Sequence, residues 1–168
     1  MITERQSRTQ FNMWAVMSSP LLISGTLINI SPWDLETYTN DEVIAVDQDP
    51  LGRQGIRLVG NDLVVDSTDN THNNNNNDND VINVWGRPLI DGSWAVVFIN
   101  VDSQPHNITC DYATCLQQMG FWQTDTIQVR DLWQHKSAGR FLGANGYTAY
   151  NVEPLGGSVM LKMNVQAF

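Results

Sequence analysis

Basic residues are scarce in this sequence: nine lysines and arginines stand against 18 aspartates and glutamates, for a formal charge of -9 and a pI near 4.5. Such a charge repels phosphate backbones and anionic membranes, so we expect no nucleic-acid partner. No apolar run approaches the roughly 20 residues that span a bilayer, and we expect no membrane segment. With 168 residues, 42% of them hydrophobic, the chain can still bury a substantial core.

Cysteine is nearly absent, because Cys110 and Cys115 are the only two. Their spacing is typical of a small disulfide loop in an oxidising compartment, with reduced buried thiols as the main alternative. A metal site would need further ligands, and only His106 is near. Asn29 and Asn107 each begin an Asn-X-Ser/Thr glycosylation sequon, which favours a secretory or lysosomal location only modestly because such triplets often arise by chance.

The first fifty residues predict a helix, a buried strand and a second helix. Thr3 begins a capping box, which marks the start of the first helix. The apolar run at residues 20–25 is typical of a strand covered on both faces, as in a parallel sheet. Ser31 as N-cap and Pro32 at the first helical position begin the second helix, with Leu35 facing inward. This order indicates a βα repeat whose first strand is missing.

Beyond Gly52 the sequence changes to short β-prone runs separated by turn residues, which is typical of an antiparallel sandwich. Asp91-Gly92 predicts the clearest hairpin, because this pair readily adopts the positive φ angles of a tight turn. Residues 66–80 are rich in asparagine and have little to bury, so we expect a disordered loop there. The expected strands are residues 54–59, 63–65, 81–85, 94–100, 126–131, 147–152 and 158–163.

Asp47 and Asp49 are the nearest pair of candidate catalytic carboxylates. Two-carboxylate glycoside hydrolysis needs the groups about 5–10 Å apart on rigid elements. These two lie where a helix gives way to an Asp-Pro turn, so we interpret them as capping and turn residues. His72, His106 and His135 lie in polar stretches, and no nucleophile elbow precedes any of them, so we expect surface or hydrogen-bonding roles.

The tryptophans could stack on sugars. Trp14, Trp85 and Trp94 fall in patterned elements, which favours core packing, whereas Trp122 and Trp133 are candidates for sugar stacking. The Asp-rich segment lacks the ligand order of a calcium loop. We therefore predict no catalytic, cofactor-binding or metal-ligating residue within this chain.

Five motifs occur in one order: QFNMWAVMSSPLLISGTLINIS, NDEVIAVDQDPLGRQG, VWGRPLIDGSWAVVFINV, VRDLWQHKSAGRF and EPLGGSVMLKM. Together they closely resemble the C-terminal part of the α-galactosidases, the melibiase family of retaining glycoside hydrolases that includes α-N-acetylgalactosaminidases. The resemblance covers nearly the whole chain and implies a mixed fold. Residues 1–51 would be the last helix-strand-helix of a (β/α) TIM barrel, and residues 52–168 an antiparallel all-β Greek-key sandwich.

The resemblance implies an enzyme that hydrolyses terminal α-linked galactose with retention, through two aspartates on middle barrel strands. In the family both aspartates precede the segment that Met1 begins. We therefore expect Met1 to be an internal residue of a longer protein, and this chain alone to be inactive. Galactose and N-acetylgalactosamine specificity stay open, as does a rival reading as a non-catalytic carbohydrate-binding or structural sandwich module.

Three further expectations follow from the resemblance. Asp47 stands where the family usually has asparagine, at the joint between the last barrel helix and the β domain. Cys110 and Cys115 fall near a short-range disulfide of some relatives, which favours a bond between them. The family is commonly secreted, vacuolar or lysosomal, its substrates are α-galactosides, and a homodimer is left open. Because barrel partners would be absent, we expect residues 1–51 to pack in a non-family manner, to associate with another copy or to be partly disordered.

Overall fold

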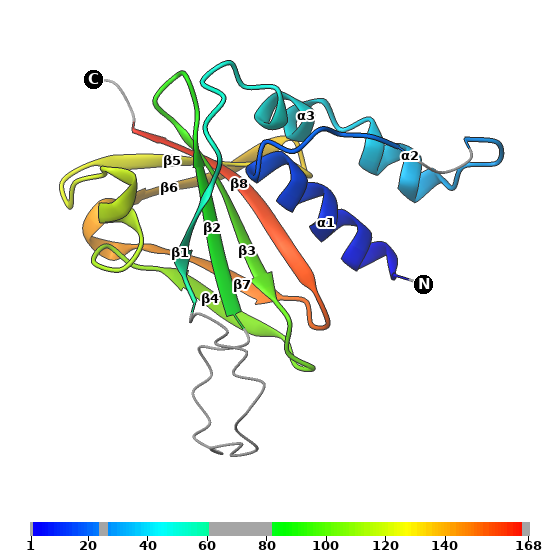
Figure 1. Ribbon diagram of the computed structural model, residues 1–168. Coiled ribbons are helices and arrows are strands. Elements are labelled where there is room, and N and C mark those ends of the chain that lie inside the picture. The colour runs from blue at the N-terminus through cyan, green and yellow to red at the C-terminus, as the bar shows by residue number, and fades with distance from the viewer. Residues whose placement is uncertain (1, 24–26, 61–81, 166–168) are drawn as a thin grey trace, which may run out of the picture.

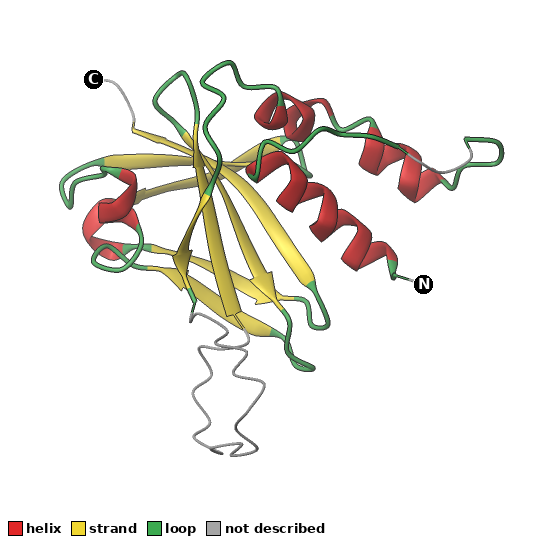
Figure 2. Ribbon diagram, viewed as in Figure 1, coloured by secondary structure: helices red, strands yellow, loops and turns green. Residues whose placement is uncertain are grey.

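The computed structural model describes residues 2–23, 27–60 and 82–165, in which three helices precede a β sandwich (Figures 1 and 2). The helices are α1 (Glu4–Val16), α2 (Pro32–Tyr38) and α3 (Asp41–Asp47). The strands are β1 (Ile56–Val59), β2 (Ile82–Pro88), β3 (Trp94–Asn100), β4 (His106–Cys110), β5 (Thr126–Asp131), β6 (Lys136–Leu142), β7 (Tyr147–Val152) and β8 (Gly157–Val165), with short 3₁₀ turns η2 (Leu116–Met119) and η3 (Gly143–Asn145). Within the described ranges, no helix is long and apolar enough to cross a membrane.

Six strands form one antiparallel sheet in the order β1-β2-β3-β8-β5-β6, and β4 pairs with β7 in a second sheet. Figure 2 shows the helices on one side of the large sheet, away from the small one. The predicted fold, a few helices followed by an antiparallel sandwich, is therefore confirmed.

The side chains of strand β3 show that the large sheet is covered on both faces. Val96 and Phe98 belong to the core between the two sheets, whereas Ala95, Val97 and Ile99 belong to the core beneath the helices. Successive side chains of a strand point to opposite faces. The continuous apolar sequence of this strand thus fits a strand covered on both sides. We call these two sets the sandwich core and the helix-facing core.

The predicted helix starts are confirmed. The N–H of Gln6 donates to Thr3 Oγ1 at 3.2 Å and the N–H of Thr3 donates to Gln6 Oε1 at 3.0 Å, which completes the capping box. Ser31 Oγ accepts the N–H of Asp34 at 3.0 Å, and Pro32 is the first residue of α2. Each cap satisfies amide groups that have no partner inside the helix.

The buried strand predicted at residues 20–25 is wrong for the part of it that the structure describes. Residues 20–23 form no strand, and the side chains of Leu22 and Ile23 are 78% and 52% exposed. A strand needs a neighbour to pair its backbone groups, and no described strand lies along this segment. Leu35 of α2, expected to face inward, is half exposed, so this expectation is wrong as well.

The predicted strands at 94–100, 126–131 and 147–152 are confirmed with the same bounds. So is the hairpin: β2 and β3 pair from Ile82↔Asn100 to Pro88↔Trp94, and Gly92 in the turn has a φ of 80°. The sequence missed β4 and β6, of which β6 is almost wholly exposed and shows no apolar alternation. The strand expected at 63–65 and the loop expected at 66–80 lie outside the described residues.

Candidate functional site

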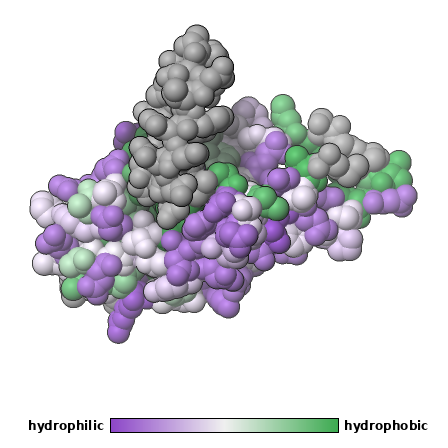
Figure 3. Space-filling model, turned by 90° about the horizontal axis from the view of Figure 1, so that it is seen from below, coloured by the Kyte–Doolittle hydropathy of each residue, from purple (hydrophilic) through white to green (hydrophobic). Residues whose placement is uncertain are grey.

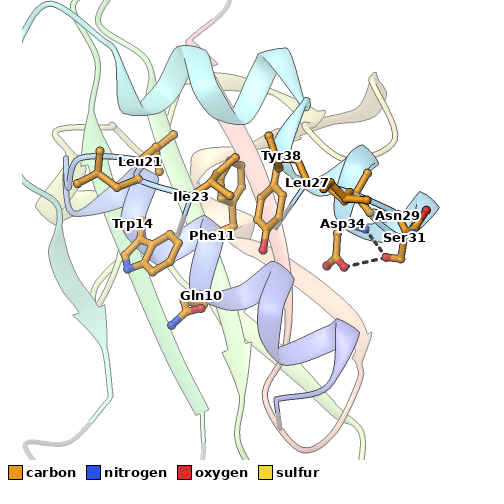
Figure 4. Close-up of a pocket in the computed structure, with 13 residues that line it drawn as sticks. Gln10, Phe11, Trp14, Leu21, Ile23, Leu27, Asn29, Ser31, Asp34 and Tyr38 are labelled. Carbon is orange, nitrogen blue, oxygen red and sulfur yellow. Dashed lines mark hydrogen bonds between the residues drawn. The ribbon is translucent and has the colours of Figure 1, made fainter. Parts of the chain in front are cut away.

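A groove of about 510 Å³ opens between α1, the segment that follows it and α2. Figure 4 shows Phe11 and Trp14 from α1, Leu21 and Ile23 from the next segment, and Tyr38 from α2 around the same hollow. We call it the apolar groove. Its lining residues are Gln10, Phe11, Trp14, Leu21, Leu22, Ile23, Leu27, Ile28, Asn29, Ile30, Ser31, Asp34 and Tyr38.

The chemistry of the apolar groove is that of a packing surface. Asp34 is the one carboxylate in its lining, and it accepts the hydroxyl of Ser31 at 2.8 Å and helps to cap α2. A single carboxylate, already hydrogen-bonded to a neighbouring hydroxyl, cannot supply both the acid and the base that glycoside hydrolysis needs. Across the described residues, no cluster of three His, Cys, Asp or Glu side chains could hold a metal ion. Figure 3 shows hydrophobic residues near this end of the molecule, whereas the surface over the sandwich is mostly hydrophilic or neutral.

Arg87 on β2 joins the helices to the large sheet. The residue is fully buried, and its guanidinium donates to the backbone oxygens of Ala15 at 2.6 Å and Asp47 at 3.1 Å, and to Ser18 Oγ at 3.2 Å. These acceptors lie near the ends of α1 and α3. Burial lowers the pKa of Arg87, and the charges of Asp47 and Asp49 counter this shift. This role of Arg87 was not predicted from the sequence, although an arginine two residues after Trp85, and so on the same face of the strand, was a usable signal.

Asp49 has the turn role that the sequence predicted, and it also fastens a neighbouring hairpin. Its Oδ1 accepts the N–H groups of Leu51 and Ile90, each at 3.0 Å. Asp47 is different and corrects the prediction of a cap. It is the last residue of α3, and its buried Oδ1 has no hydrogen-bond partner among the described residues. Burial raises the pKa of the Asp47 carboxyl, and the Arg87 charge counters this rise in part.

Asp47→Asn is expected to remove a pH-dependent contribution to stability. The folded chain holds the Asp47 proton to a higher pH than the unfolded chain, whose aspartates titrate near about 3.9. The contribution is therefore complete below about pH 3.9 and is lost as the pH rises through the raised pKa. The variant should melt above the parent chain near pH 7, and this gap should close on acidification. Thermal melts across this range check it, and a gap that is constant with pH would contradict it.

Arg8 covers one face of Trp133, which is one of the two tryptophans predicted to stack on sugars. Its guanidinium carbon lies 4.1 Å from the ring centroid of Trp133 and 3.8 Å from that of Trp33. The Trp133 Nε1–H donates to Asn12 Oδ1 at 2.9 Å, and the ring packs on the helix-facing core. Trp122, in contrast, is 70% exposed. Sugar stacking by either residue stays a prediction, and the geometry leaves more room for it at Trp122.

Cys110 and Cys115 form a disulfide with an S–S distance of 2.03 Å, and both are fully buried in the sandwich core. The bond ties the end of β4 to the start of η2. The two predicted glycosylation sites lie in different parts of the fold. Asn107 is exposed on β4, and Asn29 lines the apolar groove with a φ of 60°.

The two described histidines have hydrogen-bonding roles, as the sequence predicted. His106 Nε2 lies 2.6 Å from Asp102 Oδ2, and His135 Nδ1 lies 2.8 Å from Glu42 Oε1. Arg130 also donates to both oxygens of Glu42, at 2.7 and 2.6 Å, and this lowers the pKa of Glu42. This cluster fastens α3 to β5. His72 lies outside the described residues.

The fold and the groove define an antiparallel β-sandwich joined to a helical segment with an uncovered apolar side. Comparison with known families identifies this combination. Residues 79–163 match the family described as "Alpha galactosidase C-terminal beta sandwich domain", and residues 1–49 match the family described as "Alpha galactosidase A". The chain belongs to the α-galactosidase, or melibiase, family.

Relatives show how much of such a protein the chain represents. Alpha-galactosidase 3 of Arabidopsis thaliana is 36% identical over 135 residues, which are 80% of this chain and 26% of that protein. The alpha-galactosidase of Cyamopsis tetragonoloba is 31% identical over 81% of this chain and 28% of its own length. The chain thus spans little more than a quarter of these relatives.

Solved structures agree on the fold. Alpha-galactosidase I from Mortierella vinacea superposes with a TM-score of 0.77 at 23% identity, over 96% of this chain and 36% of its own. The α-galactosidase from Saccharomyces cerevisiae with raffinose gives 0.78 at 18% identity, over 99% of this chain and 44% of its own. These superpositions include the helices as well as the sandwich. Of the three outcomes expected for residues 1–51, a packing unlike that of the family is therefore not found in their described part, and association with another copy stays a prediction.

Proposed function

We propose that this chain is the C-terminal portion of an α-galactosidase whose complete form hydrolyses terminal α-linked galactose with retention. Residues 1–51 would complete the (β/α) barrel and residues 52–168 would form the β-sandwich domain. The observation that carries the proposal is the pair of family matches, at residues 1–49 and 79–163, on either side of this boundary. The boundary itself is part of the proposal.

The apolar groove gives the helical segment its role in this proposal. Leu22 and Ile28 are 78% and 79% exposed, and burying a side chain of this size contributes roughly 1.5–3 kcal/mol. A contiguous set of such residues marks a surface that another body covers. In the complete enzyme that body would be the rest of the barrel, which would also supply the catalytic carboxylates.

Substrate and compartment belong to the same proposal. The Alpha-N-acetylgalactosaminidase of Gallus gallus is 31% identical over 135 residues, which does not exceed the 36% of the Arabidopsis α-galactosidase, so we favour α-galactosides as substrates. The buried disulfide between Cys110 and Cys115 supports a secretory, vacuolar or lysosomal location, because such bonds persist in oxidising compartments. A carbohydrate-binding module that uses Trp122 rests on one exposed ring and is the weaker hypothesis. A homodimer stays a prediction.

The chain alone is expected to leave an aryl α-galactoside unhydrolysed, at the rate of a buffer blank. The reason is that Asp34 is the single carboxylate among the residues that line the apolar groove, and it is already hydrogen-bonded to Ser31. A chimera should behave differently: the Mortierella vinacea enzyme with its C-terminal portion replaced by this chain should hydrolyse the same substrate. Release of the aryl group, measured by absorbance for the chain and the chimera together, checks both expectations.

Matched variants show whether the groove acts as proposed. Ile28→Asp in the chimera places a charge on the surface that the barrel should cover, and activity should fall at least tenfold. Leu142→Asp places the same charge on an exposed residue of β6, which is 44% accessible and outside the groove, and should have little effect. Turnover by the chain alone would refute the proposal. So would a folded chimera that is inactive on both α-galactosides and α-N-acetylgalactosaminides.

A further inference from the structure

The outer face of the β4–β7 sheet carries the second glycosylation sequon, Asn107-Ile108-Thr109. Ile108 and Cys110 are buried in the sandwich core, whereas Asn107 and Thr109 are exposed. This alternation follows from the two-residue period of a strand. Both side chains that define the sequon are therefore presented together on the solvent side of β4.

The side-chain amide of Asn107 is held in place through its oxygen, Oδ1, and not through its nitrogen, Nδ2. Its Oδ1 accepts the backbone N–H of Asn151 on β7 at 2.9 Å. Among the described residues no hydrogen bond engages Nδ2, the atom to which an N-linked sugar is attached. The Thr109 hydroxyl lies on the same face, 2.9 Å from the hydroxyl of Thr148.

An exposed aromatic ring lies across from this site. His106 pairs with Val152 and Ile108 with Ala149, so Tyr150 and Asn151 both lie across from Asn107, at a bulge in β7. At such a bulge two residues of one strand oppose a single residue of its partner. Tyr150 is 75% exposed, and its ring offers an apolar face to a sugar attached beside it.

The first sequon, Asn29-Ile30-Ser31, is placed differently. The Ser31 hydroxyl caps α2: it accepts the N–H of Asp34 at 3.0 Å and donates to Asp34 Oδ2 at 2.8 Å. Pro32 follows directly and fixes the start of that helix. Asn29 also lines the apolar groove, which the proposed function assigns to packing. A glycan there would stand in the way of the barrel.

We propose that Asn107 carries an N-linked glycan whose first sugar packs on Tyr150, and that Asn29 stays unmodified. The inference rests on the proposed secretory location. The reaction joins Asn107 Nδ2 to C1 of an oligosaccharide that a lipid diphosphate carries. The C1–O bond to the diphosphate breaks, the lipid diphosphate leaves with the bonding electron pair, and Nδ2 loses one proton.

The test is to express the full chain behind a secretion signal in a eukaryotic host and to measure its mass before and after peptide N-glycosidase treatment. The parent chain and Asn29→Gln should both lose the mass of one glycan. Asn107→Gln and Thr109→Ala should show no change, whereas Thr109→Ser should keep the glycan because the hydroxyl is retained. The oxidised Cys110–Cys115 pair, detected by alkylation, shows that the chain entered the oxidising lumen.

Attachment of the glycan to Asn107 and packing of its first sugar on Tyr150 are measured separately. A chain with the disulfide but without a glycan would overturn the proposal, as would a glycan lost in Asn29→Gln instead of Asn107→Gln. Removing the glycan should lower the melting temperature of the parent by about 2–4 °C, and that of Tyr150→Ala by clearly less. An equal decrease in both would refute packing on Tyr150. None of these readouts depends on galactosidase activity, so a glycosylated chain with an inactive chimera would count against the proposed function alone.

Discussion

Arg87→Met is expected to lower the free energy of unfolding by about 3–5 kcal/mol, the usual cost of removing one partner from a buried charged network. The guanidinium is fully buried and donates to the backbone oxygens of Ala15 and Asp47. Methionine fills much of the volume but donates nothing. The carbonyl groups of Ala15 and Asp47 and the Asp47 carboxyl would then lose their cation, and the ends of α1 and α3 would lose their tie to β2.

Urea denaturation of the variant, the parent and Arg140→Met measures this effect. Arg140 is exposed on β6, so its loss should change the stability by less than about 0.5 kcal/mol. Arg87→Lys keeps the charge without the planar fork of donors, and an intermediate loss is expected. Adding Asp47→Asn to Arg87→Met should recover part of the loss, because the uncompensated carboxylate is removed. A loss below about 1 kcal/mol for Arg87→Met would show that the attachment of α1 and α3 to β2 does not depend on this side chain.

The role of Arg87 also shows what the sequence could not reveal. Its acceptors Ala15 and Asp47 are 72 and 40 residues away along the chain, so no local pattern brings them together. Strand β3 was predictable because it is continuously apolar and covered on both faces, and β5 because buried and exposed side chains alternate along it. The run at residues 20–25 failed for the converse reason. Its apolar sequence predicts a covered strand, but the covering strands are not among the described residues.

The candidate site was predictable to a similar extent. The ordered motifs were enough to indicate the family, and the spacing of Cys110 and Cys115 was enough to favour their disulfide. The two tryptophans proposed for sugar stacking could not be told apart. Arg8, which covers a face of Trp133, lies 125 positions earlier in the sequence, and only the packing of α1 on the sheet brings it there.

Phe98→Ala is expected to lower the free energy of unfolding by about 3–5 kcal/mol and to weaken the whole chain. Phe98 is fully buried on the central strand β3, and its ring centroid lies 5.9 Å from that of Tyr147 on β7. It therefore holds the large sheet against the small one. Hydrogen exchange should show lost protection in the strands of both sheets and in α1, because α1 packs on strands β2, β3 and β8 of the large sheet.

Phe11→Ala is the matched control, because it removes a phenylalanine of α1 from the helix-facing core, which covers the other face of β3. Phe11 is 3% exposed in the helix-facing core, and its ring packs edge-on against Tyr38. Its loss should release protection in α1 and α3 while β4 and β7 keep theirs, because the sandwich core is untouched. That contrast would place the boundary between two units near residue 51, as proposed. Equal losses throughout the chain in both variants would contradict it, and the helices and the sandwich would then form a single cooperative unit.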